Sequence, residues 1–186
     1  MDKKEIILQT VLKLVNREGF YHLNMKNVAT EAGIAAGTIY IYFSSKEQLI
    51  NELYKKLVKD YHSAILSGYN PDSRFESNFR QMTSNAIGFY ADHKDYFSFI
   101  EQYTYSPFLF KETLEESLTI LEPLKKLLQQ AKQNNEVKNL PDELLLSLVS
   151  GPLTSLMRLF IAGKADLSQE QLRQQLIDAC WKSIMI

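Results

Sequence analysis

The sequence predicts an all-α protein of about nine helices, with three helices in an N-terminal domain and the rest in a larger C-terminal domain. Apolar residues recur three or four positions apart along most of the chain, which places them on one face of a helix. Glycine and proline number only 7 and 5 among 186 residues, which disfavours turn-rich β structure. A hydrophobic content of 45% is ample for a core.

Residues 3–18 predict an amphipathic helix that ends at Gly19. Its apolar side carries Ile6, Ile7, Val11, Leu14 and Val15. Its basic residues are expected to lie mainly on a solvated face, and they are Lys3, Lys4, Lys13 and Arg17.

Two short helices joined by a tight turn are predicted between residues 24 and 42. Asn24 is a good N-cap, because its side-chain oxygen can accept from the free amides of the first turn. Gly33 stands where the C-terminus of this helix prefers a left-handed residue. The second helix runs from about Ala35 to Tyr42. Two small alanines before the turn allow a close crossing, and the whole is typical of a helix-turn-helix.

A single long helix is predicted from Lys46 to about Leu66, because apolar residues continue at helical spacing. Ser44 or Ser45 can cap its start. The segment SGYNPDS, residues 67–73, is the clearest break in the chain. Five further helices are predicted, at residues 74–91, 94–104, 107–134, 142–163 and 168–185.

Nine aromatic residues fall between Phe89 and Phe110. Most of them are expected to be core. So many rings in so short a stretch are hard to pack without gaps, however, and several tyrosines would give a cavity a few hydroxyl groups. We therefore expect a pocket for a hydrophobic or aromatic effector. Its candidate lining residues are Phe79, Met82, Phe89, Tyr96, Phe99, Tyr103 and Phe108.

The last two predicted helices have more apolar surface than one subunit can cover. A two-fold four-helix interface would bury it, so a homodimer is expected. The alternative is that the two helices pack only within one chain. The candidate interface residues are Leu145, Leu148, Pro152, Leu156, Leu172, Leu176, Ala179 and Ser183.

The composition excludes several classes. A net charge of −1 argues against a protein that coats nucleic acid through bulk charge, although residues 1–60 hold nine Lys/Arg against seven Asp/Glu. One cysteine, Cys180, precludes an internal disulfide framework and fits a reducing compartment. No signal peptide is visible, and the apolar stretch from Leu144 to Ala162 contains serines and Arg158, so a buried helix is expected there and not a membrane span. A cytoplasmic protein is expected.

The run from Ala32 to Phe43, AGIAAGTIYIYF, followed by Ser45-Lys46-Glu47 and Leu49, closely resembles the DNA-binding domain of tetracycline-repressor-like (TetR-family) regulators. The resemblance covers roughly residues 5–52. It implies a DNA-binding domain at residues 1–46 and a ligand-binding and dimerisation domain at residues 47–186, linked by the long helix.

The resemblance also implies which residues contact DNA. Gly37 would let the backbone come close, Thr38 would touch a thymine methyl or a phosphate, and the hydroxyls of two tyrosines would reach phosphates. Lys46, beside helix amides, is the best candidate phosphate contact. Ile39, Ile41 and Phe43 are expected to be apolar anchors. The full candidate set is Asn24, Lys26, Ala36, Gly37, Thr38, Tyr40, Tyr42 and Lys46.

No phosphate-binding glycine loop, zinc-ligand spacing or nucleophile motif is present, and the three histidines lie far apart, so no enzyme, metal or cofactor is expected. The sequence is interpreted as a homodimeric regulator, most often a repressor in this family, that binds a palindromic double-stranded DNA operator and is released by a small hydrophobic effector. Family members usually carry a polar capping residue at position 35 and often a polar base-reading residue at position 36, but both are alanine here. These departures leave an alternative open, a helical ligand-binding or protein-interaction dimer without specific DNA recognition.

Overall fold

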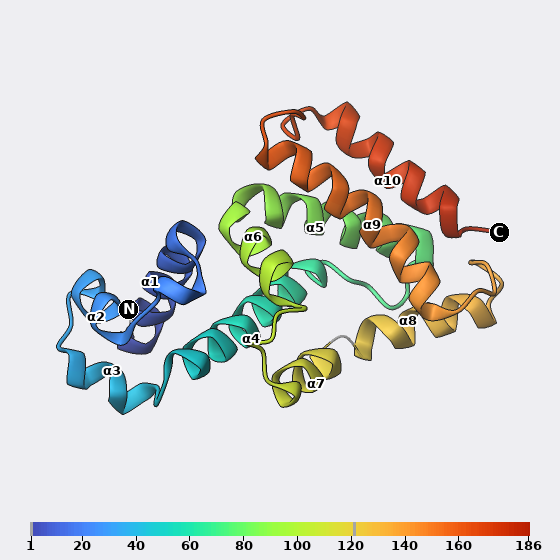
Figure 1. The fold of residues 1–186 in the computed structure, drawn as a ribbon. Coiled ribbons are helices and arrows are strands. Elements are labelled where there is room, and N and C mark those ends of the chain that lie inside the picture. Colours follow the sequence, from blue (N-terminus) through green and yellow to red (C-terminus); the bar gives the residue numbers. More distant parts are fainter. Residues whose placement is uncertain (1, 121) are drawn as a thin grey trace. The chain divides into compact units, whose positions relative to one another are not determined.

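The computed structural model describes residues 2–120 and 122–186, and each regular element in these ranges is a helix (Figure 1). The only β-type pairing there is an isolated bridge between Val137 and Met185. One short 3₁₀ helix, η1 (Phe20–His22), follows the first α-helix. The ten α-helices are α1 (Lys3–Glu18), α2 (Met25–Ala32), α3 (Ala36–Tyr42), α4 (Lys46–Ile65), α5 (Phe75–Asp92), α6 (Lys94–Tyr103), α7 (Lys111–Ile120), α8 (Glu122–Gln133), α9 (Asp142–Ile161) and α10 (Glu170–Ile184). The predicted all-α class is confirmed.

The chain packs as two compact units. Unit 1 comprises Met1–Asp60 and His93–Thr119, and unit 2 comprises Tyr61–Asp92 and Ile120–Ile186. The helix α4 supplies residues to both. These units are defined by packing, so the domain boundary expected near residue 46 remains a prediction.

In unit 1, helix α1 packs against α2 and α6 through a fully buried apolar face. The side chain of Asn16 on α1 donates to the backbone oxygen of Asp95 at 2.9 Å. The buried side chain of Asn51 on α4 donates to the backbone oxygen of Phe108 and accepts from the backbone N–H of Phe110. These bonds attach α6 and the segment after it to the helices that carry the N-terminal motif.

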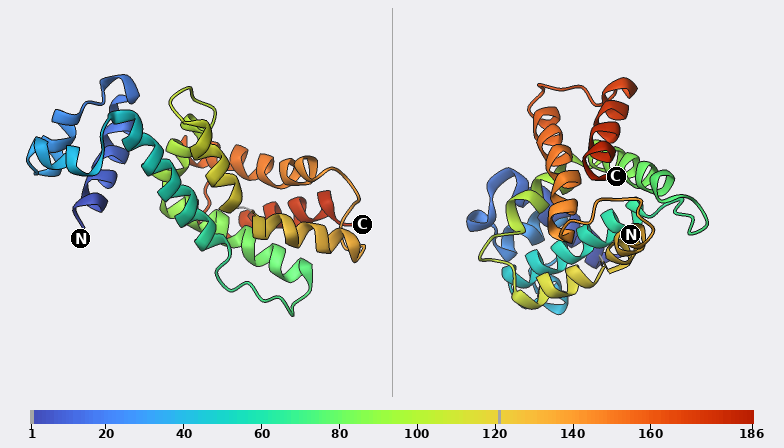
Figure 2. Two further views of the ribbon diagram at one scale, coloured as in Figure 1. Left: turned by 90° about the horizontal axis from the view of Figure 1, so that it is seen from below. Right: turned by 90° about the vertical axis from the view of Figure 1, so that its right-hand side faces the viewer.

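In unit 2, helices α5, α9 and α10 share one core, and α9 and α10 lie side by side (Figure 2). Phe79, Leu145, Cys180 and Trp181 belong to this core. At its edge, the guanidinium of Arg80 on α5 donates to the carboxylate of Asp178 on α10 at 2.6 Å. Burial raises the pKa of the Cys180 thiol.

The segment predicted as one helix over residues 107–134 is two helices in the structure, α7 and α8. Pro107 lies in the preceding loop, and the chain becomes helical only at Lys111. Pro123 is the second residue of α8, where a missing N–H costs nothing because the first-turn amides have no partner within the helix. Because this segment forms two helices, the described ranges contain ten α-helices and not the predicted nine or so.

The prediction that helix α9 is buried is wrong for the single chain. Only one side of it packs, through Leu145, Leu153 and Met157. Only 17% of its most apolar 18-residue window is buried. With a mean hydropathy of 1.7, α9 is the one helix of the described residues that is long and apolar enough to cross a membrane. Length and composition alone do not distinguish a membrane span from a helix that packs against protein. The opposite side exposes Leu144, Gly151, Pro152, Ser155 and Leu159, which we call the α9 stripe.

Among the candidate interface residues, Leu145 is only 1% exposed and packs in the core of unit 2 within the single chain. Its role in an interface remains a prediction. The other seven candidates on α9 and α10 are partly or fully exposed: Leu148, Pro152, Leu156, Leu172, Leu176, Ala179 and Ser183.

Candidate nucleic-acid interface

The turn between α2 and α3 forms as predicted from local chemistry. The side-chain oxygen of Asn24 accepts from the backbone N–H of Asn27 at 2.9 Å, which caps α2. Gly33 ends α2 with φ 67° and ψ 31°, the left-handed conformation that lacks a steric penalty only for glycine. The next residue, Ile34, donates its N–H back to the carbonyl of Ala29. The direction in which α3 leaves the turn is therefore set by the caps of α2.

Helix α3 begins at Ala36, and Ala35 at its N-cap position makes no side-chain bond, as its methyl group requires. Two residues four positions apart, Ile39 and Phe43, are 0% and 1% exposed and fix the helix on the core. Apart from its chain neighbours and the backbone of its own helix, no atom of the described residues lies within 4 Å of a Cβ placed on Gly37. The backbone of α3 at Gly37 thus faces open space in the free protein.

The outward face of α3 carries three large side chains that the fold does not bury. Tyr40 is 57% exposed, Ile41 79% and Tyr42 38%. The expectation that Ile41 anchors the helix is therefore wrong. Ile41 is two positions from both Ile39 and Phe43, which is about 200° around a helix from each, so it falls on the opposite face. The helical period itself contained this signal.

Lys46 is the first residue of α4, where Ser45 caps the helix by accepting from the N–H of Gln48. Its ammonium lies 4.4 Å from the centroid of the Phe20 ring, and Phe20 in turn stacks on Phe108 at 3.7 Å between centroids. The ring face attracts the cation and holds it at the start of the helix. Lys46 forms no ion pair within the residues that the structure describes, so its charge is not neutralised.

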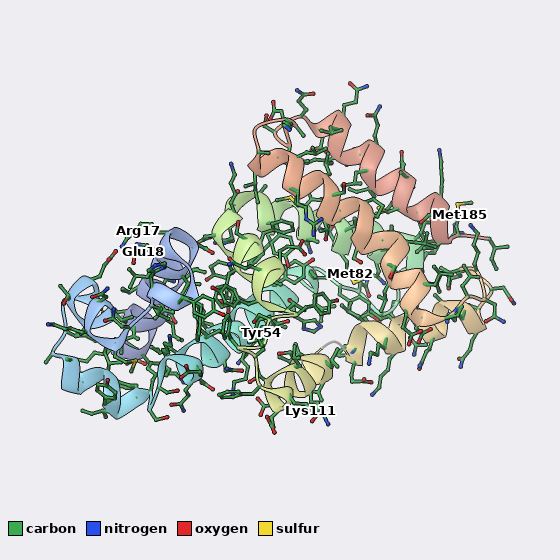
Figure 3. The ribbon with its side chains drawn as sticks, in the orientation of Figure 1. Arg17, Glu18, Tyr54, Met82, Lys111 and Met185 are labelled. Carbon is green, nitrogen blue, oxygen red and sulfur yellow. The ribbon has the colours of Figure 1, made fainter. Side chains whose placement is uncertain are left out.

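In contrast to Lys46, two basic residues of α1 form ion pairs within the protein. Arg17 makes a forked pair with Glu31 at 3.0 and 2.9 Å and also bonds Glu18 beside it (Figure 3). This fork lowers the pKa of Glu31 and raises the pKa of Arg17. Lys4 pairs with Glu52 on α4 at 3.0 Å. Lys4 is therefore less available for phosphate than an unpaired lysine.

Unit 1 brings the eight candidate DNA contacts to three positions: the start of α2, the outward face of α3 and the start of α4. Asn24 and Lys26 are exposed on α2, and Thr38 and Lys46 are partly exposed. Whether these residues touch DNA remains a prediction. Ile41 is exposed on the same face of α3, although the sequence analysis assigns it to the core.

The seven candidate pocket residues fall into several aromatic groups. In unit 1, Phe99 stacks on Tyr103 at 4.6 Å, and Tyr103 also contacts Phe108. Tyr96 packs against His93. In unit 2, Phe89 contacts Tyr61 and Tyr90, Phe79 contacts Phe75 and Trp181, and Met82 is partly buried. A pocket lined by all seven remains a prediction.

Three buried polar atoms among the described residues lack a hydrogen bond: His62 Nε2, the Tyr103 hydroxyl and Ser106 Oγ. Burial lowers the pKa of His62 and raises the pKa of Tyr103, where the nearby backbone amide of Phe20 acts in the opposite direction. Such atoms are rare in folded proteins and often mark a place where a water or ligand binds. No group of three or more His, Cys, Asp or Glu that could hold a metal occurs in the described ranges.

Two protein-family models match the chain. Residues 7–53, which contain the turn and α3, match the bacterial regulatory proteins of the tetR family. Residues 75–185, more than half of the chain, match the tetracyclin repressor-like C-terminal domain. The chain is 30% identical over 106 residues to an uncharacterized HTH-type transcriptional regulator of Haemophilus influenzae, an alignment that spans 57% of each protein. It is 28% identical over 139 residues to the regulator YvdT of Bacillus subtilis, over 73% of this chain and 70% of YvdT.

Solved structures share the whole fold. A tetR-family regulator from Shewanella superposes with a TM-score of 0.89 at 24% identity over 100% of both chains. The tetR-family regulator of Haemophilus influenzae gives 0.84 at 23% identity, over 100% of this chain and 97% of the other. At these identities the structures support the fold, while the family models support the membership. The chain therefore belongs to the tetR family of DNA-binding transcriptional regulators, which are not enzymes.

Proposed function

We propose that this regulator is a homodimeric repressor that binds a palindromic operator through α3 and is released by a small effector with apolar or aromatic character. The observation that carries the proposal is the outward face of α3, where Tyr40 and Ile41 are more than half exposed and serve no purpose in the fold. The major groove, about 12 Å wide, admits such a helix. Repressor action is the usual mode in this family and fits a protein that works by occupying DNA.

The chemistry of α3 predicts that shape contributes more than hydrogen bonds to operator choice. Ala36 and Ile41 have no polar side-chain atom, so they can recognise only apolar groups such as the thymine methyl. Thr38 and the tyrosine hydroxyls of Tyr40 and Tyr42 are the hydrogen-bonding groups that α3 offers. With so few of them, the deformability and groove width of the operator would supply part of the specificity.

The α9 stripe supports the homodimer. It consists of aliphatic and small side chains, which suit the close approach of a second copy of the same helix. On α10, Leu172, Leu176, Ala179 and Ser183 are also at least partly exposed and would complete a four-helix interface. Two recognition helices held in this way would meet successive major grooves about one DNA turn apart, which is the reason for a palindromic operator.

The effector is proposed to act through α4, because this one helix carries Lys46 at its start and His62 near its end. A ligand can release DNA only by as much as it favours one arrangement of the two reading heads over the other. In unit 1, the buried polar atoms of Tyr103 and Ser106 that lack hydrogen bonds support a ligand that adds one or two polar groups to an apolar body. This role fits a cytoplasmic protein that meets both DNA and metabolites.

A selection of bound fragments from sheared genomic DNA, repeated at low and high salt, tests the proposal. We expect enrichment of one palindromic sequence that survives added salt. If all enrichment disappears as salt rises, only phosphate attraction is present. The repressor would then be replaced by a second candidate, a helical dimer that binds a ligand or protein without recognising DNA sequence. The alanines at positions 35 and 36 favour this second candidate.

A further inference from the structure

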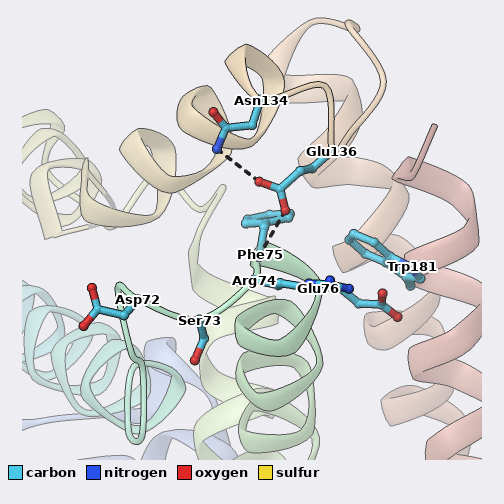
Figure 4. Close-up of a pocket in the computed structure, with 8 residues that line it drawn as sticks. All are labelled: Asp72, Ser73, Arg74, Phe75, Glu76, Asn134, Glu136 and Trp181. Carbon is cyan, nitrogen blue, oxygen red and sulfur yellow. Dashed lines mark hydrogen bonds between the residues drawn. The ribbon is translucent and has the colours of Figure 1, made fainter.

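A surface cavity of about 590 Å³ lies in unit 2 at the start of α5 (Figure 4). Its walls come from the segment before α5, from the segment after α8, and from α10. Two aromatic rings contribute to it, Phe75 and Trp181, whose centroids are 6.1 Å apart with a tilt of 47°. This volume is in the range of sites that hold small organic molecules. None of the candidate effector residues lines this cavity, although Phe79 packs on both of its rings from the core side.

The charges around this cavity favour a cation. Three carboxylates line it, from Asp72, Glu76 and Glu136, against the single guanidinium of Arg74, so negative charge is in excess by two. An anion would be expected at the start of α5, where helix amides are free. That position is already taken, because Glu136 Oε2 accepts from the backbone N–H of Phe75 at 3.2 Å.

The existing hydrogen bonds indicate what kind of cation fits. The second oxygen of Glu136 accepts from the side chain of Asn134, and Glu76 accepts from the Nε of Arg80 at 2.8 Å. Glu136 accepts only from neutral donors and so keeps its full charge, while Glu76 shares the guanidinium of Arg80 with Asp178 and is neutralised only in part. A quaternary ammonium group donates no hydrogen bonds and is recognised by aromatic faces and negative charge. An ammonium that donates three hydrogen bonds would find fewer free acceptors.

We infer that this cavity is a binding site for a quaternary or other weakly hydrogen-bonding organic ammonium ion, with its apolar part against Phe75 and Trp181 and its charge beside Glu76 and Glu136. The inference does not depend on DNA binding. It assigns to unit 2 a second ligand site, formed by the entry to α5 and the end of α10, in addition to the proposed effector pocket.

Trp181 makes the test direct, because it is the only tryptophan of the chain. The full-length protein would be titrated, without DNA, with benzyltrimethylammonium, benzyl alcohol and benzoate, which share an aromatic ring and differ in charge. Tryptophan fluorescence and equilibrium dialysis would both be recorded. We expect a saturable fluorescence change and retained probe for benzyltrimethylammonium alone.

Two variants locate the binding. The double variant Glu76→Gln, Glu136→Gln keeps the shape and the acceptor for the Phe75 N–H but removes two charges, and should weaken binding about tenfold or more. Phe75→Leu keeps an apolar residue but removes the ring, and should weaken binding about threefold. The matched control is Glu170→Gln, an exposed acid at the opposite end of α10, which should change nothing. Circular dichroism would confirm that each variant is folded.

The inference is overturned by any of four results. Equal binding of benzyl alcohol would mean an apolar cavity without charge recognition. Stronger binding of benzoate would mean that Arg74 and the start of α5 dominate. No retention of benzyltrimethylammonium by dialysis, or unchanged affinity in the double variant, would mean that the cavity is not its site. None of these results bears on operator binding, which the genomic selection tests separately.

Discussion

Helices α3 and α9 both expose apolar side chains, but the chemistry that they expose differs. On α3 the exposed side chains are Ile41 and two tyrosines, whose rings end in hydroxyl groups. On α9 the stripe consists of aliphatic, small and proline residues over most of a 20-residue helix. A tyrosine surface suits a wet, polar partner such as the DNA groove, whereas an aliphatic and small-residue surface suits a dry contact with another protein surface. An exposed apolar surface therefore predicts a binding partner, and the polar groups mixed into that surface predict whether the partner is DNA or another protein.

The largest expected effect comes from placing a charge on the α9 stripe. Gly151 is exposed, and a Cβ there meets no atom, so Gly151→Arg leaves the single chain intact and improves its helix propensity. In a dry interface the same guanidinium would be buried without a partner, which should weaken dimerisation by about 100-fold or more. Analytical ultracentrifugation over a concentration series measures this. Ser84→Arg, on an exposed position of α5, is the control, and an unchanged dimer in Gly151→Arg would disprove an α9 interface.

The second effect concerns the outward face of α3. Tyr40→Ala should reduce operator affinity by about tenfold, equivalent to ~1.4 kcal/mol, while the stability of the free protein stays nearly constant because the ring is 57% exposed. Fluorescence anisotropy with the selected operator gives the affinity. Tyr105→Ala removes a ring that is 96% exposed elsewhere in unit 1 and should leave affinity unchanged. If both variants bind like the original protein, α3 does not enter the groove.

Gly37→Ala should move stability and DNA affinity in opposite directions. Alanine in place of glycine within a helix stabilises the free protein by about 0.5–1 kcal/mol, and no atom of the protein obstructs its Cβ. Operator binding should weaken several-fold, because the added methyl group stands between the α3 backbone and the DNA. Thermal melting and anisotropy measure the two quantities. A variant that is stabilised and binds normally would show that the backbone at Gly37 does not approach DNA.

Lys46→Gln should affect the salt dependence more than the sequence preference. Loss of one phosphate contact lowers the slope of log affinity against log salt by about 1 and affects all DNA sequences alike. Lys111→Gln, an exposed lysine of α7, is the matched control. An unaltered slope in Lys46→Gln would mean that the ammonium only packs on the Phe20 ring.

The smallest effect is a pH dependence of stability at the α1–α2 contact. The Arg17 fork lowers the pKa of Glu31, so the folded protein binds its proton less readily than the unfolded chain. The stabilisation is then fully present above the ordinary Glu value near 4.5 and disappears as pH falls through the lowered pKa of the folded state. Urea unfolding of the protein and of Glu31→Gln should therefore differ slightly at pH 7, and the difference should shrink as the pH falls below 4.5 toward the lowered pKa of the folded state. A difference that grows on acidification would contradict this pairing.

Local chemistry made much of unit 1 predictable from the sequence. The cap at Asn24, the left-handed Gly33 and the start of α4 depend on residues within four positions of one another, and the structure agrees with each. The apolar character of Ile41 favours a core position, but its place in the helical period puts it on the outward face of α3. The contact of Lys46 with Phe20 joins residues far apart in the chain, so no local pattern reports it.

The C-terminal part shows where sequence patterns lose information. Leu145 and Leu148 are both leucines on one helix, yet only Leu145 is fully buried, because the orientation of α9 depends on which neighbours it packs against. The cavity beside Phe75 combines three segments that are distant in sequence. Periodicity identifies a helix and its apolar side, but it does not identify which other helix that side meets.

The most direct test of the central claim is a titration of the selected operator with the full-length protein, with sedimentation used to count chains per DNA. We predict two chains on the complete palindrome and a single half-site that binds at least about 100-fold more weakly, since a dimer uses both recognition helices at once. Equal affinity for the half-site and the palindrome, or a single chain on the palindrome, would contradict dimeric recognition by α3.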